Sequence, residues 1–318
     1  MWDNSLDSLL SKLISEDRVL RDEPMFIHTT FRVGGKAKRF ITVREADEFA
    51  AVLGMLDDAG AVYSYDGKSS DDRVSYYVIG NGSNLLVSDA GYDGLVIDMS
   101  GMDDITVEGD MIIAKAGAML GKIANTALDN DLKGFEFASG IPGTLGGAVC
   151  MNAGAYGGEM KDVVTEVTVF DRDSQSIKTL TCDEMDFGYR HSVIKNKPYV
   201  VLNARIMLTK GQHEEISALM KDYNGRRREK QPLEYPSAGS TFKRPVGFYA
   251  GGLIEESGLK GYSVGGAEVS DKHAGFVINK DKATAADIYR LICEVREKVY
   301  ADTGVRLEPE VVFLGEFA

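Results

Sequence analysis

The sequence predicts an α+β fold in which helices and strands follow one another without regular alternation. Most strand-like segments lie between residues 39 and 208, and helical patterns take over after Gly211. No sustained βαβαβ order is present, so a doubly wound parallel sheet is not predicted. The chain has 318 residues, of which 44% are hydrophobic, and this combination is typical of a globular protein of two or three domains.

The helices are predicted from apolar residues at helical spacing. The chain opens with an amphipathic helix, because such a repeat runs through Leu6, Leu9, Leu10, Leu13 and Ile14. Glycine or proline marks the end of several later helices. The further expected helices cover residues 45–60, 119–131, 213–232, 248–256 and 284–304.

Strands are predicted from short apolar and β-branched runs that end at turn-forming residues. The expected strands cover residues 39–43, 61–65, 75–80, 85–87, 94–100, 104–110, 111–117, 163–171, 176–181, 199–208 and 307–315, with two more near Ala267 and Gly275. The strand-rich part stops near Gly211, where we expect a domain boundary. An acidic loop from Asp66 to Arg73 joins two of the strands, and we assign it no function.

Composition and charge exclude several classes of protein. A net charge of −13 argues against a general nucleic-acid binder, although it leaves room for a local basic pocket. No apolar run reaches the roughly 18 residues of a membrane span, and the first segment lacks the basic start of a signal peptide. The thiols Cys150, Cys182 and Cys293 are far apart and odd in number, which favours a reduced, cytoplasmic protein without a metal centre.

Two glycine-rich clusters predict a ligand that carries phosphate. The first is VIGNGSNLLV, residues 78–87, in which a loop separates two strands. The second is ASGIPGTLGGAVCMNAGAYGGEM, residues 138–160, which contains seven glycines and almost no charge. Both place bare backbone N–H groups beside small hydroxyl and amide side chains, a combination that forms anion-binding nests. Glycine also leaves room for a ligand to approach the backbone closely.

Neither cluster is a common nucleotide motif. The GNGSNL segment lacks the third glycine of a Rossmann fingerprint, and a strand follows where that motif needs a helix. The DGKSS segment is not a P-loop, because Val62 stands where the first glycine is required. The sequence pattern therefore favours a phosphate-bearing ligand on an unusual scaffold.

The two clusters together closely resemble the UDP-N-acetylenolpyruvoylglucosamine reductase (MurB) family. The resemblance extends over nearly the whole chain, from HTTFRVGGKAKRF at residues 28–40 to RLEPEVVFLG at residues 306–315. The short spacing between Arg190 and Ser240 resembles the second type of this family, which lacks an extra loop that closes over the substrate. Which segment closes over the substrate instead is not evident from the sequence.

The resemblance implies a two-part FAD-binding domain of the vanillyl-alcohol-oxidase (PCMH) type, residues 1–94 and 95–211, followed by a smaller α+β substrate domain, residues 212–318. The FAD is expected to be non-covalent, because all four histidines, His28, His191, His213 and His273, lie outside both clusters in the sequence. Expected FAD-binding residues are Gly80, Asn81, Gly82, Ser83, Asn84, Leu85, Ser139, Gly140, Ile141, Pro142, Gly143, Thr144, Gly147, Asn152, Gly154 and Ala155.

The family reaction, carried over to matching motifs, gives three catalytic residues. A hydride passes from NADPH to FAD and then to the enolpyruvyl double bond of a UDP-sugar, which leaves a carbanion that must be protonated. Ser240 in YPSAGSTFKRP resembles the proton donor, and Arg190 in DFGYRHS resembles the arginine that stabilises the enolate. Glu310 in RLEPEVVFLG resembles the glutamate that assists protonation, whereas Glu308 is a nearby carboxylate without that match.

Three further residues are expected at the substrate. Lys230 in GRRREKQP matches a substrate-binding lysine, although a basic run is more often a solvated helix face. Arg244 stands where some relatives have asparagine, and Tyr189 is a further candidate for the pocket lining. The resemblance implies a cytoplasmic enzyme of peptidoglycan precursor synthesis, and the oligomeric state stays open.

The sequence also allows three alternative functions to be considered. The GYSVG segment around Ser263 formally matches a hydrolase nucleophile elbow, but a helix precedes it and strands follow, so we interpret it as a turn. An FAD oxidase of another small substrate would keep the fold, and oxygen consumption without NADPH would reveal it. A non-catalytic FAD-binding module would have no need of Arg190, Ser240 and Glu310 together.

Overall fold

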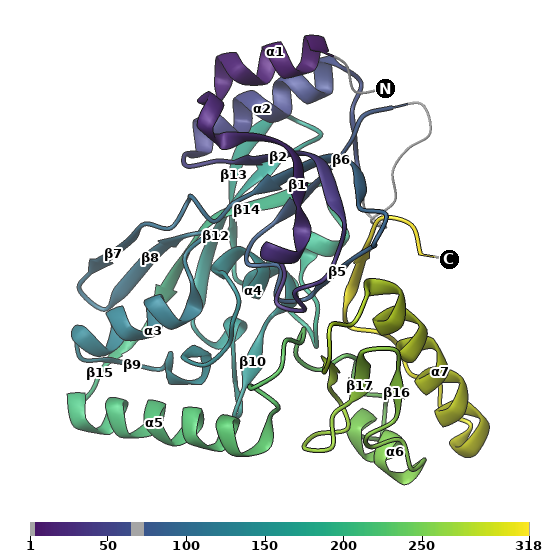
Figure 1. The fold of residues 1–318 in the computed structure, drawn as a ribbon. Helices are drawn as coiled ribbons and strands as arrows, with labels where there is room; N and C mark the ends of the chain where they lie inside the picture. Colours follow the sequence, from purple (N-terminus) through teal and green to yellow (C-terminus); the bar gives the residue numbers. More distant parts are fainter. Residues whose placement is uncertain (1–3, 65–72, 318) are drawn as a thin grey trace.

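A computed structural model describes residues 4–64 and 73–317 and shows helices packed around three main sheets (Figure 1). The α+β class is confirmed, because a largely parallel sheet and an antiparallel sheet occur in the same chain. The acidic loop expected from Asp66 lies outside the described residues, apart from Arg73 at its end.

The first sheet has the strand order β1-β2-β6-β4-β3. Its central strands are parallel, whereas β1 pairs antiparallel with β2 at one edge. Strands buried on both faces need continuous apolar runs, as in the GLVI segment of β6. The elements of this part are α1 (Asn4–Leu13), β1 (Val19–Pro24), β2 (Lys36–Thr42), α2 (Ala46–Asp58), β3 (Val62–Tyr63), β4 (Ser75–Ile79), β5 (Leu85–Val87) and β6 (Tyr92–Asp98).

The second sheet is antiparallel throughout, with the strand order β13-β12-β14-β8-β7. Helix α5 runs beneath α3 and β9 in Figure 1. The elements of this part are β7 (Ile105–Glu108), β8 (Met111–Lys115), α3 (Leu120–Asp129), β9 (Leu132–Lys133), α4 (Leu145–Met151), β10 (Gly154–Ala155), β11 (Gly158–Glu159), β12 (Val164–Asp171), β13 (Ser176–Thr181), β14 (Tyr199–Met207), β15 (Thr209–Lys210) and α5 (His213–Lys230).

The C-terminal part is smaller and packs around its last helix. Helix α7 begins with a capping box, in which Thr284 and Asp287 each accept the other's backbone N–H, and it ends at Gly304 with φ of 73°. The last strand then returns to pair with β5 in parallel, which ties this part to the first glycine cluster. The elements are α6 (Ala250–Glu256), β16 (Ser263–Val264), β17 (Ala267–Val269), β18 (Val277–Asn279), α7 (Ala285–Thr303) and β19 (Val312–Leu314).

The packing of the core does not follow the expected domain boundaries. The boundary after residue 94 falls within β6, and one hydrophobic core joins Ile41 and Phe49 of the first part to Ile112 of the second sheet. Helix α5 also packs on this core through Ile216 and Met220, so it lies with the second sheet. By apolar contact, α5 therefore packs with the second sheet, although it follows the expected boundary near Gly211.

The sequence pattern missed several elements near the candidate site. Strand β1 is an edge strand with the sequence VLRDEP, which carries neither an apolar run nor an alternating pattern. Helix α4 lies inside the second glycine cluster, where two glycines obscure the buried spacing of Leu145, Ala148 and Val149. The cluster is therefore a loop, a short helix and a small hairpin rather than bare loop throughout.

Candidate active site

The two glycine clusters meet in space. The side-chain amide of Asn81 donates a hydrogen bond of 2.6 Å to the carbonyl oxygen of Pro142. Gly80 packs so closely on Thr144 that any Cβ at position 80 would overlap the threonine hydroxyl. A cavity of about 460 Å³ is lined by Gly80, Asn81 and Pro142. Segments about sixty residues apart in the sequence therefore form one site.

Contacts within the protein explain several of the glycines. A Cβ at Gly82 would strike the His28 carbonyl oxygen, and Gly82 also has φ of +56°. Gly140 lies under Asn224 and Arg227 of α5, and Gly154 lies against the β11 backbone. Gly143 has more room, because its nearest neighbour, the Ser83 hydroxyl, would be 3.5 Å from an added Cβ. Close backbone approach to a ligand thus explains only part of the glycine content.

The residues around the cavity fit a flavin dinucleotide. Asn81 and Thr30 supply neutral polar groups, and Arg32 adds a positive charge at the lining for a phosphate. Ile27 and Pro142 add apolar surface for a ring system. Among the described residues, no group of three or more potential metal ligands gathers.

Histidine 28 also lines this cavity, although it lies far from both clusters in the sequence. Its Nε2 is 2.9 Å from the Glu23 carboxylate, and its ring stacks on Phe40 with the centroids 4.1 Å apart. The sequence position of His28 therefore does not remove it from the site. Its ring is instead engaged by Glu23 and Phe40, which supports a non-covalent FAD.

The close contact at Gly82 gives a direct test of the cavity. We expect Gly82→Ala to lower the thermal midpoint and the flavin content of the purified protein, because the methyl group would displace the segment that carries His28. Gly109→Ala is the matched control, since Gly109 has φ of +65° with no atom within 4 Å. Both variants incur the left-handed backbone cost of roughly 1–2 kcal/mol. Equal flavin content in the two variants would contradict the role of the Gly82 contact.

Arg190 lies at the tip of a two-residue turn between Gly188 and His191, which form backbone hydrogen bonds in both directions. Its φ of +52° is uncommon for a residue with a side chain. The turn is tied to the second glycine cluster, because the Asn152 amide donates 3.1 Å to the Gly188 carbonyl oxygen. The Ser192 hydroxyl makes a second tie, 2.9 Å to the carbonyl oxygen of Cys150.

Glu310 is joined to the first glycine cluster. The Asn84 side-chain amide donates 2.9 Å to the Glu310 carbonyl oxygen, and the Val312 N–H donates 3.0 Å to the Asn84 carbonyl oxygen. The backbone N–H of Glu310 donates 2.8 Å to the carbonyl oxygen of Thr241. Ser240, the residue before Thr241, is exposed and follows Gly239, whose φ is +74°. The structure thus brings the Ser240 segment next to Glu310.

Arg190 and Glu310 form an ion pair, with 2.6 Å between Nε and Oε1. The side chains are 24% and 11% exposed, so the pair is largely removed from solvent. Oε2 of Glu310 is buried and accepts no hydrogen bond within the described residues. Burial raises the pKa of Glu310, and the charges of Arg190, Lys195 and Lys243 act in the opposite direction. A carboxyl with one unpaired, buried oxygen is suited to hold or pass on a proton.

Tyr189 and Arg244 lie together at the edge of this group. The Arg244 backbone N–H donates 3.0 Å to the Tyr189 hydroxyl, and the Arg244 guanidinium stacks on Tyr249 at 4.1 Å from the ring centre. Both Tyr189 and Arg244 are exposed. Glu308, the neighbouring carboxylate, instead pairs with Lys243 at 3.0 Å and is also exposed. These contacts separate Glu308 from the Arg190 pair.

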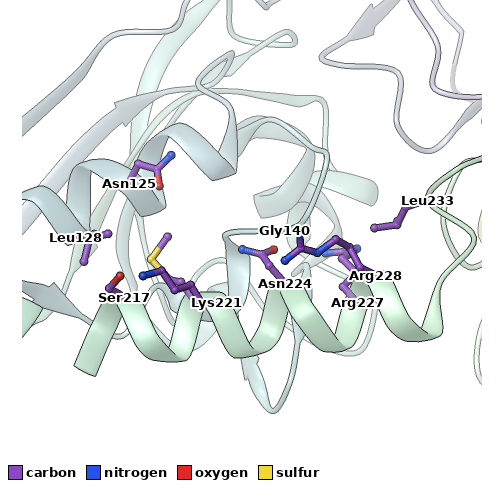
Figure 2. A pocket seen from close by; sticks show the side chains of 10 residues that line it. Asn125, Leu128, Gly140, Ser217, Lys221, Asn224, Arg227, Arg228 and Leu233 are labelled. Atoms are coloured by element: carbon purple, nitrogen blue, oxygen red, sulfur yellow. The ribbon is translucent and has the colours of Figure 1, made fainter. Parts of the chain in front are cut away.

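A second cavity, of about 550 Å³, lies between α3 and α5. Figure 2 shows Lys221 of α5 on the side of Asn125 of α3, whereas Asn224 and Arg227 point toward Gly140. The lining reaches Gly140 of the second glycine cluster. The expected substrate residue Lys230 is exposed at the end of α5 and is not part of this lining. Arg227 has one guanidinium nitrogen, Nη1, that is buried without a hydrogen-bond partner within the described residues.

Some expected FAD-binding side chains have contacts within the protein instead. Asn152 is 1% exposed, and both of its N–H donors are used, by Glu159 at 2.6 Å and by Gly188. Leu85 is 4% exposed and belongs to the core beside β5. Ser139 accepts a hydrogen bond of 3.2 Å from Asn224. These residues support the shape of the site from within.

The sequence reasoning missed two contributors. Lys195 donates a hydrogen bond to the Arg190 carbonyl oxygen, and Asn224 secures the second glycine cluster. The spacing of Ser217, Lys221, Asn224 and Arg228 on one face of α5 is a signal that could have identified the helix face. The Lys195 contact had no such signal, since it depends on the shape of the Arg190 turn.

Comparison with known proteins agrees with this geometry. Residues 231–314 match the family profile described as UDP-N-acetylenolpyruvoylglucosamine reductase, C-terminal domain, and residues 67–180 match an FAD binding domain. The chain is 48% identical over 307 residues to the UDP-N-acetylenolpyruvoylglucosamine reductase of Caldanaerobacter subterraneus subsp. tengcongensis, covering 96% of this chain and 97% of that one. It is 49% identical over 312 residues to the enzyme of the same name from Agathobacter rectalis, covering 94% and 95%.

A solved structure supports the same relationship across the whole fold. The UDP-N-acetylenolpyruvylglucosamine reductase (MurB) of Thermus caldophilus aligns with a TM-score of 0.77 at 34% identity, covering 93% of this chain and 99% of that one. The fold and the site define an FAD-dependent oxidoreductase. More particularly, the chain belongs to the UDP-N-acetylenolpyruvoylglucosamine reductase (MurB) family.

Proposed function

We propose that the protein reduces UDP-N-acetylglucosamine enolpyruvate to UDP-N-acetylmuramate with NADPH and bound FAD, in cytoplasmic peptidoglycan precursor synthesis. The observation that carries the proposal is the meeting of the Arg190–Glu310 pair and the Ser240 segment beside both glycine clusters. Family membership at 48–49% identity over nearly the whole chain supports the substrate assignment. Within the described residues, no helix is long and apolar enough to cross a membrane.

The chain's own residues provide substrate activation and protonation. Bound FAD would supply the hydride-transfer chemistry that links NADPH to the substrate double bond. Arg190 stabilises the enolate that develops beside the substrate carboxylate, because a fixed guanidinium fork matches that geometry. The Ser240 hydroxyl donates the proton, and the carbanion is basic enough to accept it from this weak acid. Glu310 assists that transfer from its place beside Arg190 and Thr241.

We place the FAD along the meeting line of the two clusters. Gly80, Asn81, Gly82, Ser83 and Asn84 approach it from one side, and the segment from Gly140 to Thr144 with Gly147 approaches it from the other. The backbone of Gly154 and Ala155 completes the second side. Asn152, Leu85 and Ser139 support this shape through the contacts described above. The two FAD-binding parts are then residues 1 to about 98 and residues 99–230, because β6 and α5 end there.

The deciding experiment follows the flavin spectrum of the purified protein without oxygen. NADPH should bleach the flavin absorbance, and the UDP-enolpyruvyl sugar should restore it. Absorbance that returns only with oxygen would favour an oxidase of another substrate. A flavin that NADPH does not reduce would favour a binding module without redox function.

The bound FAD should be released by acid precipitation. The ring of His28 lies near the cavity, but its Nε2 is engaged by Glu23 and its face by Phe40, so it is not positioned for a bond to flavin. We therefore expect yellow flavin in the supernatant. Flavin that remained in the pellet would contradict this, and a His28→Gln variant would then show whether His28 carries the bond.

Lys230 is the first candidate for the substrate diphosphate. Lys230→Ala should raise the KM for the UDP-sugar roughly 10- to 150-fold, the equivalent of one lost charge-assisted contact of about 1.5–3 kcal/mol, with little change for NADPH. Arg226→Ala is the matched control, because Arg226 lies on the same helix and pairs with Asp222 at 2.7 Å. An unchanged sugar KM in Lys230→Ala would mean that the end of α5 is a solvated face.

A further inference from the structure

The turn that carries Arg190 needs support from outside itself. Tyr189 and Arg190 form the connection between Gly188 and His191, and only two backbone hydrogen bonds, of 3.0 and 3.2 Å, close it. Arg190 adopts the left-handed conformation with φ of +52°, which is unfavourable for a residue with a Cβ. Such a conformation persists only when surrounding contacts fix it.

Lys195 supplies a contact at the strained residue itself. Its Nζ donates a hydrogen bond of 2.7 Å to the carbonyl oxygen of Arg190. The short 3-10 turn Val193–Lys195 brings the lysine back toward the Arg190 turn. The preceding residue, Ser192, is fully buried and bonds to the Cys150 carbonyl oxygen, so this segment is anchored to α4. The Lys195 ammonium thus binds the Arg190 turn from a segment that is itself anchored.

The charge of Lys195 also acts on the catalytic group. The charged groups that face Glu310 are Arg190, Lys195 and Lys243, and each favours its ionised form. Lys243 is already paired with Glu308. Lys195 lacks such a carboxylate partner within 4 Å among the described residues, and its hydrogen bond goes to the Arg190 backbone. Lys195 therefore fixes the backbone of Arg190 and also adds a positive charge near Glu310.

We propose that Lys195 is a positioning residue for the second half-reaction, in which the reduced flavin reduces the UDP-sugar. Lys195 holds the Arg190 turn so that the Arg190 guanidinium faces both Glu310 and the substrate enolate. This inference rests on the proposed function, because it assigns a role within that reaction. Lys195 acts through Arg190 and needs no contact with the substrate.

Stopped-flow reoxidation by the UDP-enolpyruvyl sugar separates positioning from substrate binding. Lys195→Met should lower the rate constant at saturating sugar about 10- to 100-fold, as expected for one lost charge-assisted hydrogen bond, and leave the sugar concentration at half-saturation within about threefold. Lys195→Arg should restore most of the rate, because it can donate to the same carbonyl oxygen. Lys197→Met is the matched control and should behave like the native protein, because Lys197 lies two residues further on and is exposed, as Lys195 is.

Two kinetic outcomes would overturn the proposal. A native rate in Lys195→Met would mean that the turn holds without the lysine. A normal rate with much weaker sugar binding would make Lys195 a substrate ligand instead. If the native protein failed to transfer electrons to the sugar, the proposed function would be contradicted. Hydrogen exchange would then decide whether Lys195 holds the Arg190 turn.

Hydrogen exchange tests the same contact without any substrate. The amides of Gly188 and His191, which close the turn, should exchange about 10- to 100-fold faster in Lys195→Met than in the native protein or in Lys197→Met. Amides of β14 should keep their protection, which would show that the fold is intact. Unchanged exchange at Gly188 and His191 would overturn the role of Lys195 in holding the turn, whatever the enzyme reduces.

Discussion

Ser240→Ala should bind FAD and accept electrons from NADPH at close to the native rate, while its reoxidation by the UDP-enolpyruvyl sugar falls roughly 10²- to 10⁴-fold. The magnitude is that of a lost general acid, since only the second half-reaction must quench a carbanion. The substitution removes one hydroxyl from an exposed residue. The neighbouring Thr241 keeps its backbone hydrogen bonds to Gly275 and Glu310, so the segment should stay in place.

Stopped-flow spectroscopy measures both steps on one sample of the variant. Ser263→Ala is the matched control, because Ser263 is an exposed serine of the C-terminal part and the centre of the GYSVG segment. It should react like the native protein, which would show that Ser263 has no part in either half-reaction. A Ser240→Ala variant with slow flavin reduction and normal reoxidation would place Ser240 in the nicotinamide or flavin pocket instead.

Local pattern was sufficient where a short stretch of chain determines its own structure. The loop between β4 and β5 in the first cluster follows from Gly80 and Gly82 between apolar runs, and the structure confirms the flanking strands. The long helix α7 follows from its apolar spacing and from the Thr284 and Gly304 signals at its ends. In these cases neighbours within a few residues decide the conformation.

The arrangement of the site depended on contacts between distant segments. Gly140 is a glycine because α5 lies on it, and Asn152 is buried because it joins α4 to the Arg190 turn. Neither role is visible from the residues beside them in the sequence. The family resemblance pointed to these segments, but it did not distinguish residues that line the cavity from residues that make contacts within the protein.

The packing of α5 also depends on contacts between distant segments. The change from strands to helices near Gly211 is real in the sequence, yet α5 buries Ile216 and Met220 against the core of the second sheet. Burial of apolar surface decides which domain a helix joins, and the order of elements along the chain does not. The start of the C-terminal match at residue 231 agrees with the packing.

Arg190→Ala should damage the second half-reaction about as strongly, with reoxidation by the sugar falling roughly 10²- to 10³-fold, because the developing enolate loses its fixed positive partner. Reduction of the flavin by NADPH should stay near the native rate. Arg190→Lys should recover only part of the loss, since an ammonium keeps the charge but lacks the planar fork. Equal damage to both half-reactions would mean that Arg190 acts on the flavin or on FAD binding rather than on the substrate.

Arg190→Ala should also change how the free energy of unfolding depends on pH. The direction of this change follows from the pKa of Glu310. Burial already raises the pKa of Glu310 in the folded protein, and Arg190 opposes that rise. A carboxyl with a raised pKa in the folded state favours folding below the ordinary glutamate value, and this contribution is lost as pH rises through the folded-state pKa. Arg190→Ala raises that pKa further, so the variant's deficit in unfolding free energy should grow from about pH 4.5 to pH 8.

Denaturant unfolding at both pH values measures this effect. The full deficit should stay below the roughly 3–5 kcal/mol seen when a fully buried pair is broken, because the Arg190 side chain is 24% exposed. The double variant Arg190→Ala/Glu310→Gln removes the uncompensated carboxylate, so its deficit should no longer grow with pH. An equal deficit at both pH values would mean that water solvates the ionised Glu310 carboxylate even without Arg190. The pair would then be a surface contact rather than the buried centre of the site.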